Sequence, residues 1–140
     1  MKPKKLYILI ILGLCGPILL VLSEFFSWFS NYNLIELYII FTDLQIEDSF
    51  LYLFPLISGV ICLIANGLLI TNLNYKNKSV ILSFVGLGFQ LLFFIDHISQ
   101  EIEFITDAGF GLYLGIFGFL LILINLIYVL TAIDNIQEVN

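Results

Sequence analysis

The residues with the most chemical potential surround the one histidine of the chain. His97 directly follows Asp96, and Glu101 comes one helical turn later. Glu24 ends the first long apolar stretch of the sequence, as Asp96 ends the third. Imidazole and carboxylate groups can bind divalent metals, but the spacing of these four residues matches no metal-binding motif. We expect them to form an outer acidic site that holds no metal.

Groups for covalent or redox catalysis do not form a motif in the sequence. Both cysteines, Cys15 and Cys62, lie inside long apolar stretches and make no C-x-x-C pair. The histidine has no serine or cysteine placed beside it by a motif, and no glycine-rich phosphate loop occurs. We therefore predict that the protein is not an enzyme, has no catalytic residue and binds no cofactor.

Three amide side chains, Asn66, Gln90 and Asn125, interrupt the apolar stretches. At about 1.5 Å per helical residue, Asn66 lies about 21 Å inward from Tyr52, and Asn125 about 22 Å inward from Phe110. The two asparagines can therefore meet at one depth, where a hydrogen bond between membrane helices contributes about 0.6 kcal/mol on average. We interpret these amides as structural, and a polar transport site is the alternative.

Small residues recur at helical spacing in the last two apolar stretches. Gly111 and Gly115 form a small-xxx-small pair with Gly118 nearby, and Gly86 and Gly88 lie in the preceding stretch. Small residues let membrane helices approach closely. The pattern predicts tight contacts of the last two helices, either with each other or with a partner subunit.

The elements that position these residues must be membrane helices. Of 140 residues, 61% are hydrophobic and 11% are charged, against about 45–50% and about 25% in soluble domains. Four uncharged stretches are long enough for a crossing helix of about 20 residues. We predict an all-α membrane protein, a single four-transmembrane-helix bundle with spans at about 6–23, 51–74, 79–97 and 109–133.

The few charges indicate an orientation. All five lysines lie before the first span or between the second and third, and the sequence has no arginine. The positive-inside rule makes these segments cytoplasmic, so both termini are expected on the inner side of the cell membrane, and aromatic residues near the predicted borders agree. Nine of the eleven acidic residues then lie outside. The scarcity of basic residues excludes nucleic acid as a partner.

Two outer loops are expected, at residues 24–50 and 98–108. In the first, Asn33, Glu36, Asp43 and Glu47 share one helical face, as in an amphipathic helix at the membrane interface. Residues 42–47 nearly alternate in polarity, however, and residues 38–41 are rich in strand-forming types. We favour extended structure across residues 38–47 and a small outer sheet.

The layout resembles that of claudin-like tetraspan proteins. Phe26-Ser27-Trp28 follows the first span, residues 42–46 have a strand-like pattern, and the turn between the second and third spans is short. The claudin Gly-Leu-Trp segment and the two cysteines of the first loop are absent. The glycine-rich last span, residues 109–118, is similar to that of small four-span membrane proteins of archaea and bacteria.

These observations favour a protein that works through contact within the lipid bilayer. We expect it to self-associate as a homo-oligomer or to serve as a small subunit of a membrane-protein complex. The alternative is a component of a cation channel or transporter, because an acidic outer mouth attracts cations.

Overall fold

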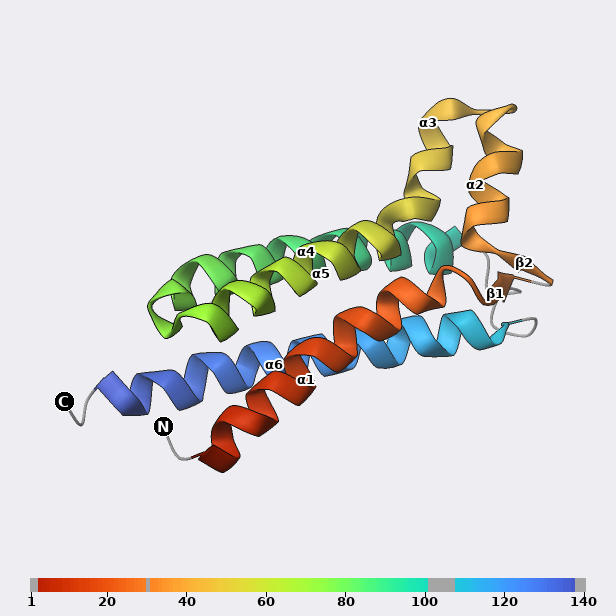
Figure 1. Cartoon of the computed structure of the whole chain (residues 1–140). Coiled ribbons are helices and arrows are strands. Elements are labelled where there is room, and N and C mark those ends of the chain that lie inside the picture. Colours follow the sequence, from red (N-terminus) through yellow and green to blue (C-terminus); the bar gives the residue numbers. More distant parts are fainter. Residues whose placement is uncertain (1–2, 30, 101–107, 138–140) are drawn as a thin grey trace.

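The computed structural model describes residues 3–29, 31–100 and 108–137, and it is mostly helical (Figure 1). Its elements in chain order are α1 (Pro3–Ser23), β1 (Ser27–Phe29), β2 (Tyr32–Asn33), α2 (Leu34–Thr42), α3 (Ile46–Ser49), the 3-10 helix η1 (Phe50–Leu53), α4 (Phe54–Thr71), the 3-10 helix η2 (Leu73–Tyr75), α5 (Lys76–Gln100) and α6 (Phe110–Gln137).

The four long helices form a bundle of two closely packed pairs. α1 packs along α6 and α4 packs along α5, while α1 and α4 join the pairs. The described ends of the chain lie at the same end of the bundle as η2, and β1 and β2 lie at the other (Figure 1). We refer to these as the η2 end and the β1 end.

Three helical stretches are long and apolar enough to cross a membrane. They are Ile46–Thr71, Leu73–His97 and Phe110–Thr131, whereas the apolar part of α1, Tyr7–Ser23, is shorter. The outer faces of the long helices carry exposed isoleucine, leucine and phenylalanine side chains, as a lipid-facing surface requires. The structure thus shows a helical protein that is compatible with a membrane.

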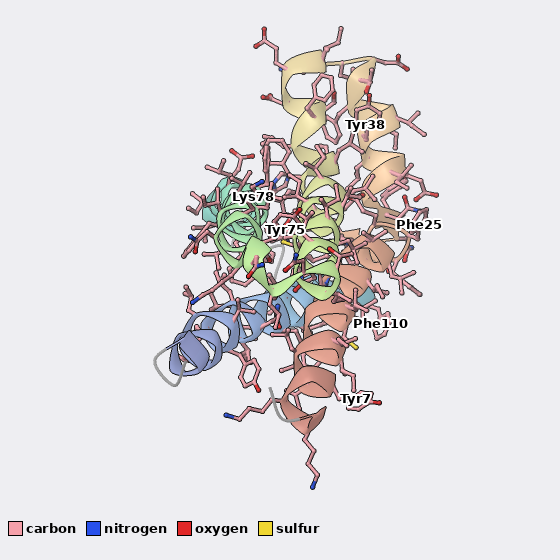
Figure 2. The ribbon with its side chains drawn as sticks, turned by 60° about the vertical axis from the view of Figure 1, so that its left-hand side comes forward. Tyr7, Phe25, Tyr38, Tyr75, Lys78 and Phe110 are labelled. Carbon is pink, nitrogen blue, oxygen red and sulfur yellow. The ribbon has the colours of Figure 1, made fainter. Side chains whose placement is uncertain are left out.

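Aromatic side chains project from the bundle near both of its ends. Tyr7 and Tyr75 are exposed at the η2 end, where the Lys78 ammonium lies 5.2 Å from the centre of the Tyr75 ring (Figure 2). Phe25 and Phe110 are exposed at the β1 end (Figure 2). Aromatic rings favour the headgroup region of a bilayer, so this distribution fits a bundle that spans one.

The first predicted loop is helical over most of its length. The prediction of extended structure across residues 38–47 is wrong, because α2 extends to Thr42 and α3 begins at Ile46. A capping box starts α2: the Asn33 side chain accepts from the Glu36 N–H at 2.8 Å, and the Glu36 carboxylate accepts from the Asn33 N–H at 3.0 Å. This cap satisfies backbone donors that a strand would leave free, and it outweighs the strand preference of residues 38–41.

A small sheet does exist, but it lies upstream of the predicted one. β1 and β2 pair antiparallel, with Ser27 opposite Asn33 and Phe29 opposite Tyr32. Phe29 also forms a bridge with Ala108, just before α6. The sheet therefore attaches the chain that follows α1 to the start of the last helix.

Candidate functional site

Trp28 of β1 closes the β1 end of the bundle. Its side chain is fully buried, and its Nε1 donates a hydrogen bond to the Ser23 carbonyl at 2.6 Å. The ring meets Phe93 of α5 edge-on, with centroids 5.2 Å apart. A single side chain thus links the end of α1 to α5.

The glycines of α6 form the seat of this indole. A Cβ added at Gly111 would lie 2.6 Å from Trp28 Cδ1, and one at Gly115 would overlap the far edge of the ring. One turn on, a Cβ at Gly118 would lie 2.9 Å from the Gly16 carbonyl of α1. The nearest neighbours of these glycines are therefore Trp28 and α1, whereas we expected α5 or a partner subunit.

The glycines of α5 differ from one another. A Cβ at Gly86 would meet the Cys62 sulfur and the Ser58 carbonyl of α4, whereas Gly88 has no atom within 4 Å of its Cβ position among the residues that the structure describes. Ser58 Oγ donates to the Gly86 carbonyl at 2.6 Å. The close approach of α5 is therefore to α4, because small residues and a hydrogen bond occur together there.

Asn66 and Asn125 lie together in the middle of the bundle. Asn125 Nδ2 donates to Asn66 Oδ1 at 2.8 Å, and Asn66 Nδ2 donates to the Cys62 carbonyl at 2.9 Å. Both side chains are buried, and Gly13 of α1 leaves room for them, since a Cβ there would lie 2.5 Å from Asn66 Oδ1. This hydrogen bond links α4 to α6, and the two side chains lie against Gly13 of α1.

Glu24 lies inside the β1 end and does not face solvent. Its side chain is 0% exposed, and Oε1 accepts the Leu56 backbone N–H at 3.0 Å in the first turn of α4. This bond supplies a partner to one of the free N–H groups at a helix N-terminus, where the helix dipole also favours negative charge.

The environment of Glu24 disfavours its ionised form. Glu24 follows the apolar stretch of α1, and burial raises the pKa of its carboxyl to about 8, although the Leu56 N–H acts in the opposite direction. Oε2 has no hydrogen-bond partner in the described part of the chain. The sequence suggested an exposed acid here because the residue that Glu24 caps is distant along the chain.

Asp96 and His97 remain side by side near the end of α5. His97 Nδ1 lies 3.6 Å from Asp96 Oδ2 and 3.1 Å from the Phe93 carbonyl. The imidazole stacks on the Phe93 ring, with centroids 4.3 Å apart, and meets Tyr52 edge-on at 5.0 Å. Aromatic packing therefore surrounds His97. Glu101, the fourth residue of the expected acidic site, lies outside the described residues.

Gln90 is the third amide and stands apart from the asparagine pair. Its side chain is 0% exposed, and neither Oε1 nor Nε2 has a hydrogen bond to any described residue. Buried polar groups without partners are uncommon, and each costs free energy. Gln90 therefore identifies a place in the bundle where the chain alone does not satisfy its own polar groups.

Comparisons with known proteins add no relative: no family model matches the chain, and no curated protein or solved structure is significantly similar to it.

Proposed function

We propose that this chain is a non-enzymatic four-span protein of the cell membrane that acts through contact with another membrane protein. The four long helices alternate in direction, and Lys4, Lys5, Lys76 and Lys78 belong to segments at the η2 end. The positive-inside rule then favours a cytoplasmic η2 end with both termini, and an outer β1 end.

The observation that carries this proposal is the arm formed by α2, α3 and η1. The arm stands away from the bundle axis at the β1 end (Figure 1). Large apolar side chains on it are exposed outside the apolar stretch Ile46–Thr71, including Leu44 at 72% and Ile39 at 59%. Since apolar surface that stands clear of a fold commonly marks an interaction site, the arm is the element best suited to contact.

The chemistry of the arm indicates the kind of partner. A hollow of about 470 Å³ at its tip is lined by seven consecutive residues, from Thr42 to Asp48. Three of them, Asp43, Glu47 and Asp48, are acidic, and the arm has no basic residue. A lysine or arginine of the partner would complement this hollow, with apolar side chains around it.

Charge also favours a different protein over a second copy of this chain. Four of the five lysines in the sequence, Lys4, Lys5, Lys76 and Lys78, belong to segments at the η2 end, far from the arm along the bundle. A second copy in the same membrane orientation therefore offers none of these four to the acidic hollow. We accordingly favour a small subunit of a membrane complex over self-assembly.

Site-directed photo-crosslinking tests this function. A photoreactive phenylalanine analogue at Leu44 should link, in native membranes, to a second membrane protein, and the linked segment should carry lysine or arginine. The same analogue at Ile81, an exposed residue on the α5 surface, serves as the matched control and should not capture that protein.

Two outcomes would contradict the proposal. Links from Leu44 to this chain alone would replace the partner with self-assembly. Cation flux through liposomes that contain the purified protein, lost on Asp96→Asn, would favour a conducting component.

A further inference from the structure

The arm and α4 follow one helical path that changes direction at the β1 end. The backbone stays in the right-handed helical region at Ser49, Phe50 and Phe54, where one helix passes into the next. The helical stretch Ile46–Thr71 is accordingly continuous. α4 nevertheless lies along the bundle, whereas α3 stands away from it (Figure 1). We call residues 53–56, where the direction changes, the elbow.

The backbone donors of the elbow do not continue a regular α-helix. The Phe54 N–H bonds to the carbonyl three residues earlier, as in a 3-10 helix, and the buried Pro55 has no N–H. In an unbroken α-helix the Leu56 N–H would bond to the Tyr52 carbonyl. Here it is donated to Glu24 Oε1 at 3.0 Å. A side chain from the end of α1 therefore holds the donor that a straight helix would use.

The lengths of the two segments show what the elbow changes. α4 has 18 residues, which is about 27 Å at 1.5 Å per residue and close to the ~30 Å hydrocarbon core of a bilayer. The continuous stretch Ile46–Thr71 has 26 residues, or about 39 Å if it were straight. A straight helix would carry the arm onward along the bundle axis. The elbow instead turns the arm sideways, toward a neighbour in the same membrane.

Two kinds of contact hold the elbow to the bundle. On the α5 side, the Tyr52 ring meets His97 edge-on at 5.0 Å, and the Phe54 ring meets Phe89 edge-on at the same distance. On the α1 side, the contact is the hydrogen bond to Glu24. Because a hydrogen bond weakens steeply as its angle changes, the Glu24 contact constrains the direction in which the chain leaves the elbow.

We propose that Glu24 is a positioning residue for the arm: by accepting the Leu56 N–H it keeps the elbow bent and presents Leu44 and the acidic hollow to a neighbouring membrane protein. This inference rests on the proposed contact function of the arm. Glu24 has to supply an acceptor oxygen at the correct reach. Glutamine can therefore replace it, whereas aspartate, which is one methylene shorter, and alanine cannot.

Distances between spin labels in the purified full chain test the position of the arm. Labels at Leu44→Cys and Ile124→Cys, in a Cys15→Ser background, report the distance from the arm to α6. Labels at Ile64→Cys and Ile124→Cys are the matched control within the bundle, and all three labelled residues are exposed. We expect Glu24→Asp and Glu24→Ala to shift or widen only the arm distance, and Glu24→Gln to leave both distances unchanged.

The series of substitutions separates positioning from general support of the fold. If Glu24 only stabilised the bundle, its loss would disturb the control distance as well, and that outcome would overturn the proposal. If Glu24→Ala does not fold, Glu24→Asp decides the test, because it keeps the carboxyl and changes only its reach. An arm distance that stays the same in Glu24→Asp would also overturn the proposal.

Photo-crosslinking from Leu44 distinguishes this inference from the proposed function. Capture of a partner together with an arm distance that does not respond to Glu24→Asp would refute the positioning role alone. A responding arm distance without any captured partner would refute the proposed function alone. If both hold, Glu24→Asp should lower the yield of the link and Glu24→Gln should restore it.

Discussion

The middle layer of the bundle, which holds Asn66 and Asn125, and the layer at the β1 end, which holds Glu24, differ in how their buried polar side chains are satisfied. In the middle layer, Asn125 donates to Asn66, which donates in turn to a backbone carbonyl, and Asn125 Oδ1 has no partner in the described part of the chain. In the layer at the β1 end, Glu24 accepts one bond from a backbone amide, and its Oε2 has no partner among the described residues.

The difference lies in the kind of group each layer contains. An amide has both a donor and an acceptor at any pH, and Asn125 and Asn66 share one hydrogen bond. An ionised carboxylate only accepts hydrogen bonds, whereas a protonated one also donates, so the bonding of Glu24 changes with its protonation. The layer at the β1 end is therefore expected to depend on pH, and the middle layer is not.

Trp28→Ala should have the largest effect, because it removes the buried ring that links the end of α1 to α5 and empties the seat on Gly111 and Gly115. The expected loss is about 3–5 kcal/mol of unfolding free energy, typical of a buried aromatic residue. Unfolding in detergent, followed by circular dichroism, measures it. Trp28→Phe should lose less, and an equal loss would show that the ring itself does not support the layer.

The pH dependence of stability should come next in size. Burial raises the pKa of Glu24 from 4.5 to about 8 in the folded state, so the folded protein binds the proton more tightly than the unfolded chain does. The free energy of unfolding should then be greatest in acid and fall as the pH rises from 4.5 toward about 8. The expected fall is on the order of 2 kcal/mol, because the protein relaxes around the buried charge.

Glu24→Gln should flatten this profile of Tm against pH. His97→Asn is the control, because it removes the one imidazole of the sequence, which packs on the Phe93 ring. An unchanged slope in Glu24→Gln would assign the pH dependence to another group and would remove the contrast between the layers.

Breaking the middle layer should have a smaller effect that does not vary with pH. Asn66→Leu leaves the Asn125 amide without its partner, and Asn125→Leu does the reverse. A double-mutant cycle on the free energy of unfolding should give a coupling between the two side chains of about 0.6 kcal/mol. A coupling of zero would exclude the bond as a source of stability, in spite of its 2.8 Å length.

The smallest effect on folding is expected in the arm. Leu44 is exposed, so Leu44→Ser should change the unfolding free energy by less than about 0.5 kcal/mol. The same substitution should weaken capture of the proposed partner in a pull-down from native membranes. A marked loss of stability would instead show that the arm is part of the folded core.

The helices that form the bundle were predictable because long uncharged stretches have few alternatives in a membrane. The meeting of Asn66 and Asn125 was also predictable, since the depth of a residue follows from its count along a helix. The partners of the glycines were not. Spacing indicates that a helix has a close neighbour, but Trp28 reaches Gly115 only through the fold.

Two local features show why the rest was missed. The strand-forming side chains of residues 38–41 misled the prediction because the Asn33–Glu36 capping box decides the structure of this short segment. Glu24 was expected with the outer acids because its partner, the Leu56 amide, is 32 residues away. Burial of an acid by a distant helix terminus leaves no local pattern in the sequence.

The pairing of the first and last helices has a consequence for biosynthesis. α1 finds its most extensive neighbour in α6, and the indole of Trp28 finds its seat there as well. A growing chain that contains α1, α4 and α5 still lacks that neighbour and that seat. The buried core can therefore close only after α6 has been synthesised. A chain truncated before α6 would leave Trp28 exposed to cellular quality control.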